Sequence, residues 1–334
     1  MCKRIISLLL IAVMLLSCGS CAKLTKLVEV TEDVPVPTNI VFLGDSIAAG
    51  YGLEGYADND LYNCRSYANI LADRYAEELP EDCPHSMVNK AVSGMTSSGL
   101  LESLKSGELD DVLAASDAVV VSIGGNDLLS VLFRIAGKLG YDFETGRLDL
   151  SDAKLLSAAF ELIDLKDDID KALDGFRGNL KEIAAELKAK AGGRIFVQTL
   201  YDPLEYFDIK MLSELTDDKI GRFNDIVAAC SVDGDEIIYT TVDVAGAFDG
   251  RCADLTNIAD IDIHPNAEGH EVIAEKVDSA VRKYTYSYTK TVEVTDEDAV
   301  RRLIIICAAS GAAVLAVIIA VIVVIVKKSK KKNA

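Results

Sequence analysis

Apolar and polar positions form two different patterns along this chain of 334 residues, and these patterns predict strands and helices in alternation. Short, continuous apolar runs predict buried strands at 39–43, 87–89, 118–123, 194–199 and 236–239. Apolar residues three or four apart predict helices at 66–79, 180–191 and 269–282. Strands that are apolar throughout and alternate with helices are typical of a parallel sheet covered on both faces. The pattern therefore predicts one three-layer α/β/α sandwich with a five-stranded parallel sheet, over residues 38–283.

Two stretches fall outside this simple plan. Residues 128–174 follow the third strand, are helical in pattern and rich in Leu and Asp, and predict either a lid-like helical insertion or a lengthened helix pair. Residues 26–32, in the N-terminal flank 22–37, nearly repeat residues 290–296, and both copies alternate as strands do. We expect either that the copies pair, with 284–300 forming a stalk, or that the similarity is a coincidence.

Both ends carry membrane signals. A basic start, an apolar run and small residues predict a secretory signal over 1–21. Its Leu-Leu-Ser-Cys stretch resembles a bacterial lipoprotein cleavage box, so lipidation of Cys18, plain cleavage and an uncleaved anchor all stay open. Residues 303–326 hold no charged side chain, and such a helix is about 36 Å long, enough to cross a bilayer. The basic tail at 327–334 then predicts a single-pass protein of the cell membrane with its body outside and its tail in the cytoplasm.

Charge and cysteine content narrow the class further. The formal net charge of −19 argues against nucleic acid as a partner, because phosphate contacts need clustered Lys and Arg. An even number of cysteines in an exported body predicts disulfides. The favoured pairs are Cys64–Cys83 and Cys230–Cys252, each closing a short loop, and buried free thiols are the alternative. The four cysteines of the body form no CxxC spacing that would suggest zinc, and no metal, cofactor or obligate protein partner is predicted.

Residues suited to chemistry follow the ends of several predicted strands, where reactive groups collect in a parallel sheet. Gly44-Asp45-Ser46 follows the first strand, Gly94 follows the second, and Gly124-Gly125-Asn126-Asp127 follows the third. His264-Pro265-Asn266 lies late in the chain, and the other two histidines have no supporting motif. A serine hydroxyl becomes a useful nucleophile when a neutral imidazole takes its proton. Ser46 and His264 are therefore the predicted pair.

In this order, the four blocks resemble the GDSL/SGNH hydrolase family over about 39–282, although Ile47 replaces the usual Leu. The resemblance implies a flavodoxin-like sheet, Ser46 as nucleophile and His264 as general base. It also implies an oxyanion hole made by the backbone N–H groups of Ser46 and Gly94 and the side-chain amide of Asn126.

The triad carboxylate departs from the family pattern. The family places it three residues before the histidine, where this chain has Ile261. Asp262 and Asp260 stand on either side of that position. We favour Asp262, while Asp260 and a Ser–His dyad oriented by a backbone carbonyl stay open.

The resemblance implies an esterase or lipase that works through an acyl-enzyme. The Leu-rich insertion favours a lipid or lysophospholipid ester as substrate, with an O-acetylesterase of carbohydrate or cell wall as the alternative. Two other classes stay open. One is metal-assisted hydrolysis, which would use Asp260, Asp262, His264 and His270. The other is an inactive surface binding module, because a fold does not dictate a function.

Overall fold

The computed structural model of the chain describes residues 23–128, 141–142, 147–148, 152–207, 210–260 and 262–332. The chain divides into two compact units. The larger, Asp33–Tyr288, is called the body, and the smaller, which joins residues up to Glu32 to those from Thr289 onward, is called the flanking unit. The predicted signal segment, with Cys18, lies outside the described residues, and so does Ile261.

The body is built on a five-stranded parallel sheet, as predicted. Its strands are β2 (Asn39–Gly44), β3 (Ser86–Asn89), β4 (Ala118–Ser122), β7 (Arg194–Gln198) and β10 (Thr240–Val242). They lie in the order β10-β7-β4-β2-β3, and every neighbouring pair is parallel. The carboxyl ends of all five strands therefore meet at one edge of the sheet, which is where the sequence places its reactive residues.

Helices and short elements connect these strands. The helices are α2 (Ser46–Ala49), α3 (Tyr67–Glu78), α4 (Ser97–Ser106), α5 (Asp110–Ala114), α7 (Asp152–Lys190), α8 (Lys210–Ala229), α9 (Ala245–Phe248), α10 (Cys252–Leu255) and α11 (Ala267–Val281). The 3-10 turns are η1 (Pro203–Phe207) and η2 (Ile258–Asp260), and two small hairpins pair β5 (Tyr141–Asp142) with β6 (Arg147–Leu148) and β8 (Val232–Asp233) with β9 (Glu236–Ile237).

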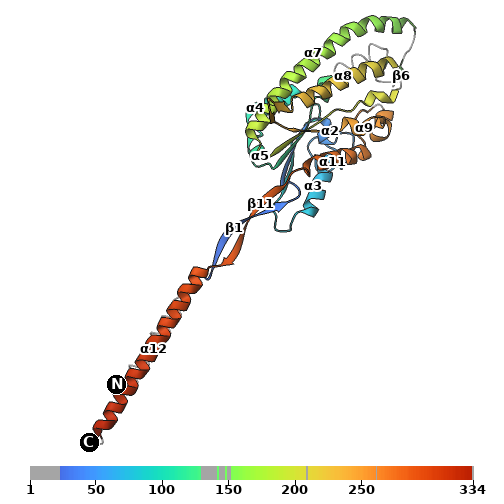
Figure 1. Cartoon of the computed structure of the whole chain (residues 1–334). Coiled ribbons are helices and arrows are strands. Elements are labelled where there is room, and N and C mark those ends of the chain that lie inside the picture. The colour runs from blue at the N-terminus through green and yellow to red at the C-terminus, as the bar shows by residue number, and fades with distance from the viewer. Residues whose placement is uncertain are drawn as a thin grey trace. The chain divides into compact units, whose positions relative to one another are not determined.

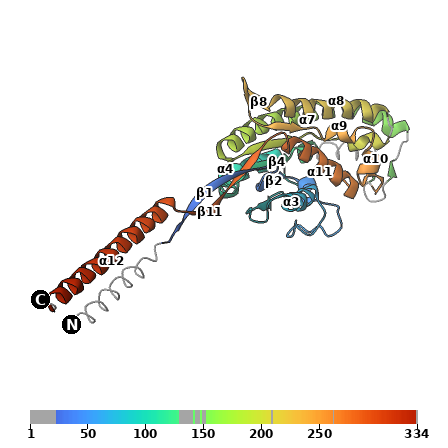
Figure 2. The same cartoon turned by 60° about the horizontal axis from the view of Figure 1, so that its bottom comes forward.

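The sheet separates two hydrophobic cores, because successive side chains of a strand point to opposite faces. Phe42 of β2 packs in the first core with buried residues of α3 and α11. Leu43, the next residue, packs in the second core with residues of α4, α7 and α8. Figures 1 and 2 show the same arrangement, with α7 and α8 on one side of the sheet and α3 and α11 on the other. The molecule therefore has the three layers that the apolar strands predict.

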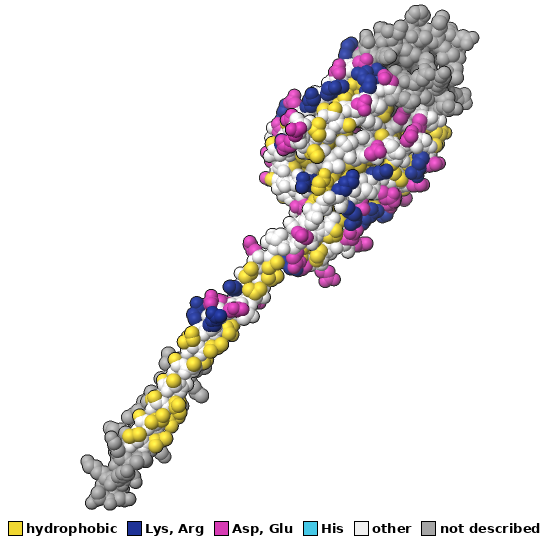
Figure 3. Space-filling view, viewed as in Figure 1, with side chains coloured by type: hydrophobic (Ala, Val, Ile, Leu, Met, Phe, Trp, Pro, Cys, Tyr) yellow, Lys and Arg dark blue, Asp and Glu magenta, His cyan; other side chains and the backbone are white. Residues whose placement is uncertain are grey.

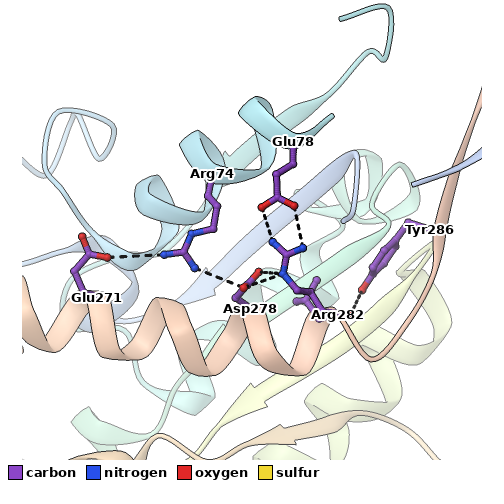
Figure 4. A network of polar contacts seen from close by, with 7 residues as sticks. Arg74, Glu78, Glu271, Asp278, Arg282 and Tyr286 are labelled. Atoms are coloured by element: carbon purple, nitrogen blue, oxygen red, sulfur yellow. Dashed lines mark hydrogen bonds and ion pairs between the residues drawn. The ribbon is translucent and has the colours of Figure 1, made fainter. Parts of the chain in front are cut away.

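Helices α3 and α11, which cover the same face, are also joined at the surface by a charge network (Figure 4). The guanidinium of Arg282 binds both oxygens of Glu78 on α3, at 2.9 and 2.6 Å. It also binds Asp278 of α11, at 2.9 Å. Arg74 of α3 lies 3.6 Å from the same Asp278. Each helix therefore binds an arginine of the other side: Glu78 of α3 binds Arg282, which follows α11, and Asp278 of α11 faces Arg74 of α3.

The insertion after β4 leads into one long helix. The segment predicted as a separate helix at 180–191 is the end of α7, which begins at Asp152 and has 39 residues. Part of the stretch at 128–174 lies outside the described residues, and the predicted lid function of this insertion stays a prediction.

The fifth strand lies a few residues later than predicted. The apolar run 236–239 is divided between β9 and the connection into β10, and Ile237 is 71% exposed. Gly234, with φ +61°, allows a tight turn that folds β9 back on β8. The sheet strand begins only at Thr240, so the predicted strand at 236–239 was wrong.

The predicted disulfides were wrong as well. Cys64, Cys83, Cys230 and Cys252 are all buried, and none of them forms a disulfide. Cys252 packs in the core on the α3 and α11 face of the sheet, and Cys230 packs in the core on the opposite face, so these two cannot meet. Cys64 donates toward the carbonyls of Ala49 and Leu61, whereas Cys83 donates to that of Pro84. The thiols behave as small core side chains with backbone acceptors.

The flanking unit contains the two segments that repeat each other. They fall in β1 (Thr25–Val34) and β11 (Tyr286–Thr295), which form a two-stranded sheet, so the predicted pairing is confirmed. The hydroxyl oxygens of Thr31 and Thr289 lie 3.3 Å apart, and the backbone N–H of Asp296 donates to the carbonyl of Leu24 at 2.8 Å. These contacts run in opposite directions along the two strands, which makes the pair antiparallel.

Helix α12 (Glu297–Lys332) follows β11 directly. Within Glu297–Val323, the most apolar window of 18 residues has a mean hydropathy of 2.8 and contains no buried residue. Figure 3 shows apolar side chains along this helix and charged side chains at its start. The helix is long and apolar enough to cross a membrane.

Candidate active site

Ser46 is placed by the sharp turn that ends β2. Gly44 has φ +138°, and a Cβ there would lie 1.9 Å from the carbonyl oxygen of Ser122 in β4, so only glycine fits. The N–H of Asp45 donates to that same oxygen at 3.0 Å. The carboxylate of Asp45 then caps α2 by accepting the N–H of Ile47 at 3.1 Å. Ser46 therefore begins a helix at the carboxyl edge of the sheet and is 6% exposed.

His264 comes to Ser46 from 218 residues away in the chain. Its Nε2 lies 2.9 Å from Oγ of Ser46, and its Nδ1 lies 2.5 Å from Oδ1 of Asp262. The backbone holds this loop in place: the N–H of Asn257 donates to the carbonyl of His264, and the N–H of Asp262 donates to the carbonyl of Asn257. Asp260, the other predicted carboxylate, is exposed at the end of η2.

Asp262 keeps its negative charge beside the imidazole. Burial raises the pKa of this carboxyl, but hydrogen bonds from the ring and backbone of His264 and from Asn257 outweigh burial, so the pKa lies below the ordinary 3.8. An ionised carboxylate at Nδ1 favours the tautomer with its proton on that nitrogen. The lone pair of Nε2 then faces the serine hydroxyl.

Asp45 is in the opposite situation. It is buried directly behind Ser46, and burial raises its pKa to about 7, although the N–H of Ile47 and the nearby His264 lower it. The neighbouring Asp127 raises it further. The carboxyl is therefore close to half protonated at neutral pH. Its role in capping α2 needs only an oxygen, which both forms provide.

The two other predicted donors of the oxyanion hole are Gly94, in the turn before α4, and Asn126, in the short helical segment at 125–128 after β4. The side-chain amide of Asn126 donates to the carbonyl of Met95 at 2.9 Å. Gly94, the residue before Met95, has φ +81°, and the space where a Cβ would stand is open. Asp127 accepts the N–H and the hydroxyl of Ser97 at 2.9 and 2.6 Å, which ties the segment that carries Asn126 to the start of α4.

A cleft lies beside these groups. Ser46, Asn126 and His264 line it, and Gly94 is not among its lining residues. Asp45 and Gly125 line it as well, and the rest of the wall is apolar or aromatic: Ile47, Leu128, Leu200, Tyr201, Pro203, Ile220 and Ile263. The sequence reasoning missed most of this wall, because isolated apolar residues carry no motif. Tyr201 and Pro203 do follow the carboxyl end of β7, and that position was the available signal.

The fourth predicted metal ligand, His270, is used elsewhere. It is fully buried, and its Nδ1 accepts the backbone N–H of Tyr67 at 3.2 Å. Burial lowers its pKa to about 3, so the ring is neutral. Within the described residues, no group of three or more His, Cys, Asp or Glu side chains is arranged to hold a metal ion.

Comparison with known proteins identifies the family. The family model described as GDSL-like lipase/acylhydrolase matches residues 42–272, which is more than half of the chain. The chain belongs to this family. This GDSL protein is thus an ester hydrolase of the lipase and esterase type. No curated protein matches it by sequence.

Solved structures agree in fold. A lipase from a goat rumen metagenome is 21% identical, with a TM-score of 0.53, over 72% of this chain and 96% of that protein. An extracellular lipase from Streptomyces rimosus is 17% identical, with a TM-score of 0.52, over 73% of this chain and 99% of that protein. At such low identity, these similarities establish the fold alone.

Proposed function

We propose that the protein is a serine esterase that hydrolyses acyl esters through an acyl-enzyme, with Ser46 as nucleophile and His264 as general base. The observation that carries the proposal is the chain of contacts from Oγ of Ser46 to Nε2 of His264 and from Nδ1 to Asp262. A hydroxyl, a neutral imidazole and an ionised carboxylate in this order are the groups that nucleophilic ester hydrolysis needs.

The reaction runs in two halves. Nε2 of His264 takes the hydroxyl proton as Oγ of Ser46 attacks the ester carbonyl, and the imidazolium then gives that proton to the departing alcohol oxygen. An acyl group is left on Ser46. A water molecule next gives a proton to His264 and attacks this acyl group, which releases the carboxylic acid and returns the proton to Ser46. Asp262 stabilises the imidazolium in both halves.

The negative charge on the former carbonyl oxygen needs donors. The backbone N–H groups of Ser46 and Gly94 and the amide of Asn126 are proposed for this role. The amide of Asn126 donates to Met95 in the free protein, so it would exchange that carbonyl for the oxyanion. The open space beside Gly94 leaves room for the approach of a substrate.

The walls of the cleft favour an apolar acyl chain. Apart from Asp45 and the catalytic groups, the lining is apolar or aromatic and includes Leu128, Ile220 and Ile263. Burying each methylene of an acyl chain there is worth about 0.8 kcal/mol. We therefore propose a lipid ester, lysophospholipids included, as the substrate class. An O-acetylesterase would use the same catalytic groups and leave most of this wall unused.

Location follows from the two ends of the chain. With the signal segment at 1–21 and helix α12 as an anchor, the body would stand outside the cell membrane and the basic tail in the cytoplasm. An esterase tethered in this way works close to the lipids of the bilayer.

The test is labelling and turnover by the purified protein. We expect a fluorophosphonate probe to label the wild type at Ser46, and p-nitrophenyl esters to be cleaved faster as the acyl chain lengthens from acetate to octanoate. Ser46→Ala should lose both labelling and turnover, and Ser231→Ala, which changes a half-buried serine far along the chain, is the matched control. A preference for acetate would favour the O-acetylesterase. Absence of labelling in the folded wild type would favour an inactive binding module.

A further inference from the structure

An exposed aromatic ring covers one side of the catalytic imidazole. The centroid of the Tyr51 ring lies 4.6 Å from that of His264, with 49° between the planes. Tyr56 packs edge-on behind it, with centroids 5.4 Å apart. Tyr51 is 43% exposed and is not among the residues that line the apolar cleft. The two tyrosines therefore form a separate surface that adjoins His264.

The loop that carries Tyr51 is fixed against the catalytic residues. Gly50 and Gly52, on either side of Tyr51, have φ near +86° and +87°. A Cβ on Gly52 would lie 3.0 Å from Oδ2 of Asp262, so the backbone runs very close to that carboxylate. The N–H of Leu53 closes the turn on the carbonyl of Gly50 at 3.2 Å. The ring is thus held beside His264 by its backbone while its outer part faces solvent.

The alcohol half of the ester is the part of the substrate that would reach this surface. The acyl half of an ester belongs in the apolar cleft, whereas the alcohol oxygen must meet Nε2 of His264 to receive its proton. The alcohol half therefore extends along the imidazole and out of the cleft. Tyr51 is the exposed ring that the imidazole contacts there.

Charge restricts which alcohols this surface accepts. The segment 50–63 carries three exposed carboxylates, Glu54, Asp58 and Asp60, and contains no Lys or Arg. Asp58 accepts the hydroxyl of Tyr56, so one of these charges is part of the aromatic pair. A negatively charged alcohol would be repelled here, while the apolar face of an uncharged ring can stack on Tyr51.

We propose that Tyr51, backed by Tyr56, is the alcohol subsite and selects esters whose alcohol is an uncharged, sugar-like ring. This proposal rests on the esterase function above and narrows the lipid ester to a neutral glycolipid type. Tyr51 determines specificity in the first half of the reaction. It has no part in deacylation, because the alcohol has already left.

The experiment holds the acyl group constant and varies the alcohol. Wild type, Tyr51→Ala, Tyr51→Phe and Tyr206→Ala are compared on octanoate esters of ethanol, of methyl glucoside and of glycerol 3-phosphate. Tyr206 is the matched control, since it is also 43% exposed but lies on η1. Fluorophosphonate labelling rates confirm in each variant that Ser46 and His264 are intact.

We expect Tyr51→Ala to lower kcat/KM for the glucoside ester about tenfold, a change of about 1.4 kcal/mol, while the ethyl ester keeps its rate. Tyr51→Phe should retain the preference, because the ring and not the hydroxyl makes the contact. The phosphate ester should be the poorest wild-type substrate.

An equal loss on ethyl and glucoside esters would overturn the proposal, since Tyr51 would then only support His264. An equal effect of Tyr206→Ala, or a wild-type preference for the phosphate ester, would overturn it too. Failure of the esterase function has a different signature, in which the wild type cleaves none of the three esters.

Discussion

The imidazole of His264 is bound on both nitrogens, and this decides which proton each nitrogen carries. Asp262 accepts at Nδ1, so Nε2 is the free base that faces Ser46. An amide in place of that carboxylate would present its N–H₂ or its oxygen with little preference, and the wrong tautomer would become populated.

Asp262→Asn should therefore lower kcat by about 10² to 10⁴ with little change in stability. Asp260→Asn is the control, because that side chain is exposed beside the same loop, and it should keep wild-type rates. Rates on p-nitrophenyl octanoate would measure both. Equal rates for Asp262→Asn and the wild type would point to a Ser–His dyad.

Asp45 gives a second prediction at this scale, on stability. Its pKa is about 7 in the folded protein and near 3.8 in the unfolded chain. Between these values the unfolded chain releases the proton and the folded protein keeps it, so stability falls as pH rises. Across this window the loss is roughly 4 kcal/mol.

Asp45→Asn keeps the oxygen that caps α2 and cannot ionise. We expect urea unfolding at pH 4 and pH 8 to show the wild type losing more stability than this variant. Parallel pH profiles for the two proteins would contradict the raised pKa.

Single residues also show where the sequence stops being informative. The blocks around Ser46 and His264 could be read directly, because each follows a strand end or a turn. The choice between Asp260 and Asp262 could not, since it depends on how Asn257 bonds the loop. The disulfide prediction was wrong for a related reason. An even number of cysteines does not show on which face of the sheet each thiol lies.

At the scale of elements, α3 and α11 share a hydrophobic core, and the Arg282 network joins their outer surfaces (Figure 4). Arg282 binds Glu78 through two parallel bonds and Asp278 through a third contact. Its hydrogen bonds with Glu78 and Asp278 raise its pKa further above an already high value. The guanidinium is therefore charged whenever the protein is folded.

Arg282→Ala should reduce the free energy of unfolding by about 1 kcal/mol, and 1 M salt should shrink the difference. Arg65→Ala is the control, since Arg65 is 65% exposed and binds only Glu271 in the described contacts. Its cost should stay below about 0.5 kcal/mol. Denaturant melts at two salt concentrations would measure both. A larger cost for Arg65→Ala would show that the network does not hold the helices.

Four of the five sheet strands could be predicted from continuous apolar runs. A strand has such a run when both faces of its sheet are covered by helices. The fifth could not, because β10 has three residues and stands after a hairpin whose own apolar side chains are exposed. The single long helix α7 was also missed. The sequence predicted a helical insertion up to residue 174 and a separate helix from residue 180, while the backbone continues unbroken between them.

At the scale of the whole molecule, the apolar part of α12 is the proposed membrane anchor. Liposomes offer a direct comparison of residues 23–334 with residues 23–296, which keep both β1 and β11. We expect the longer chain to float with the liposomes after a sucrose gradient and the shorter to stay in the aqueous layer with full esterase activity. If the longer chain remains soluble as a monomer, α12 is not a membrane anchor and this part of the proposal is wrong.

The pairing of β1 with β11 also has a consequence for synthesis. Thr31 meets Thr289 across a separation of 258 residues, so the first strand to emerge stays without a partner until nearly the last. A long unpaired edge invites aggregation. Until β11 is synthesised, charged side chains along β1 oppose such aggregation. They are Lys26, Glu29, Glu32 and Asp33. The proposed membrane helix follows β11 within a few residues, so we expect β1 and β11 to pair shortly before that helix meets a bilayer.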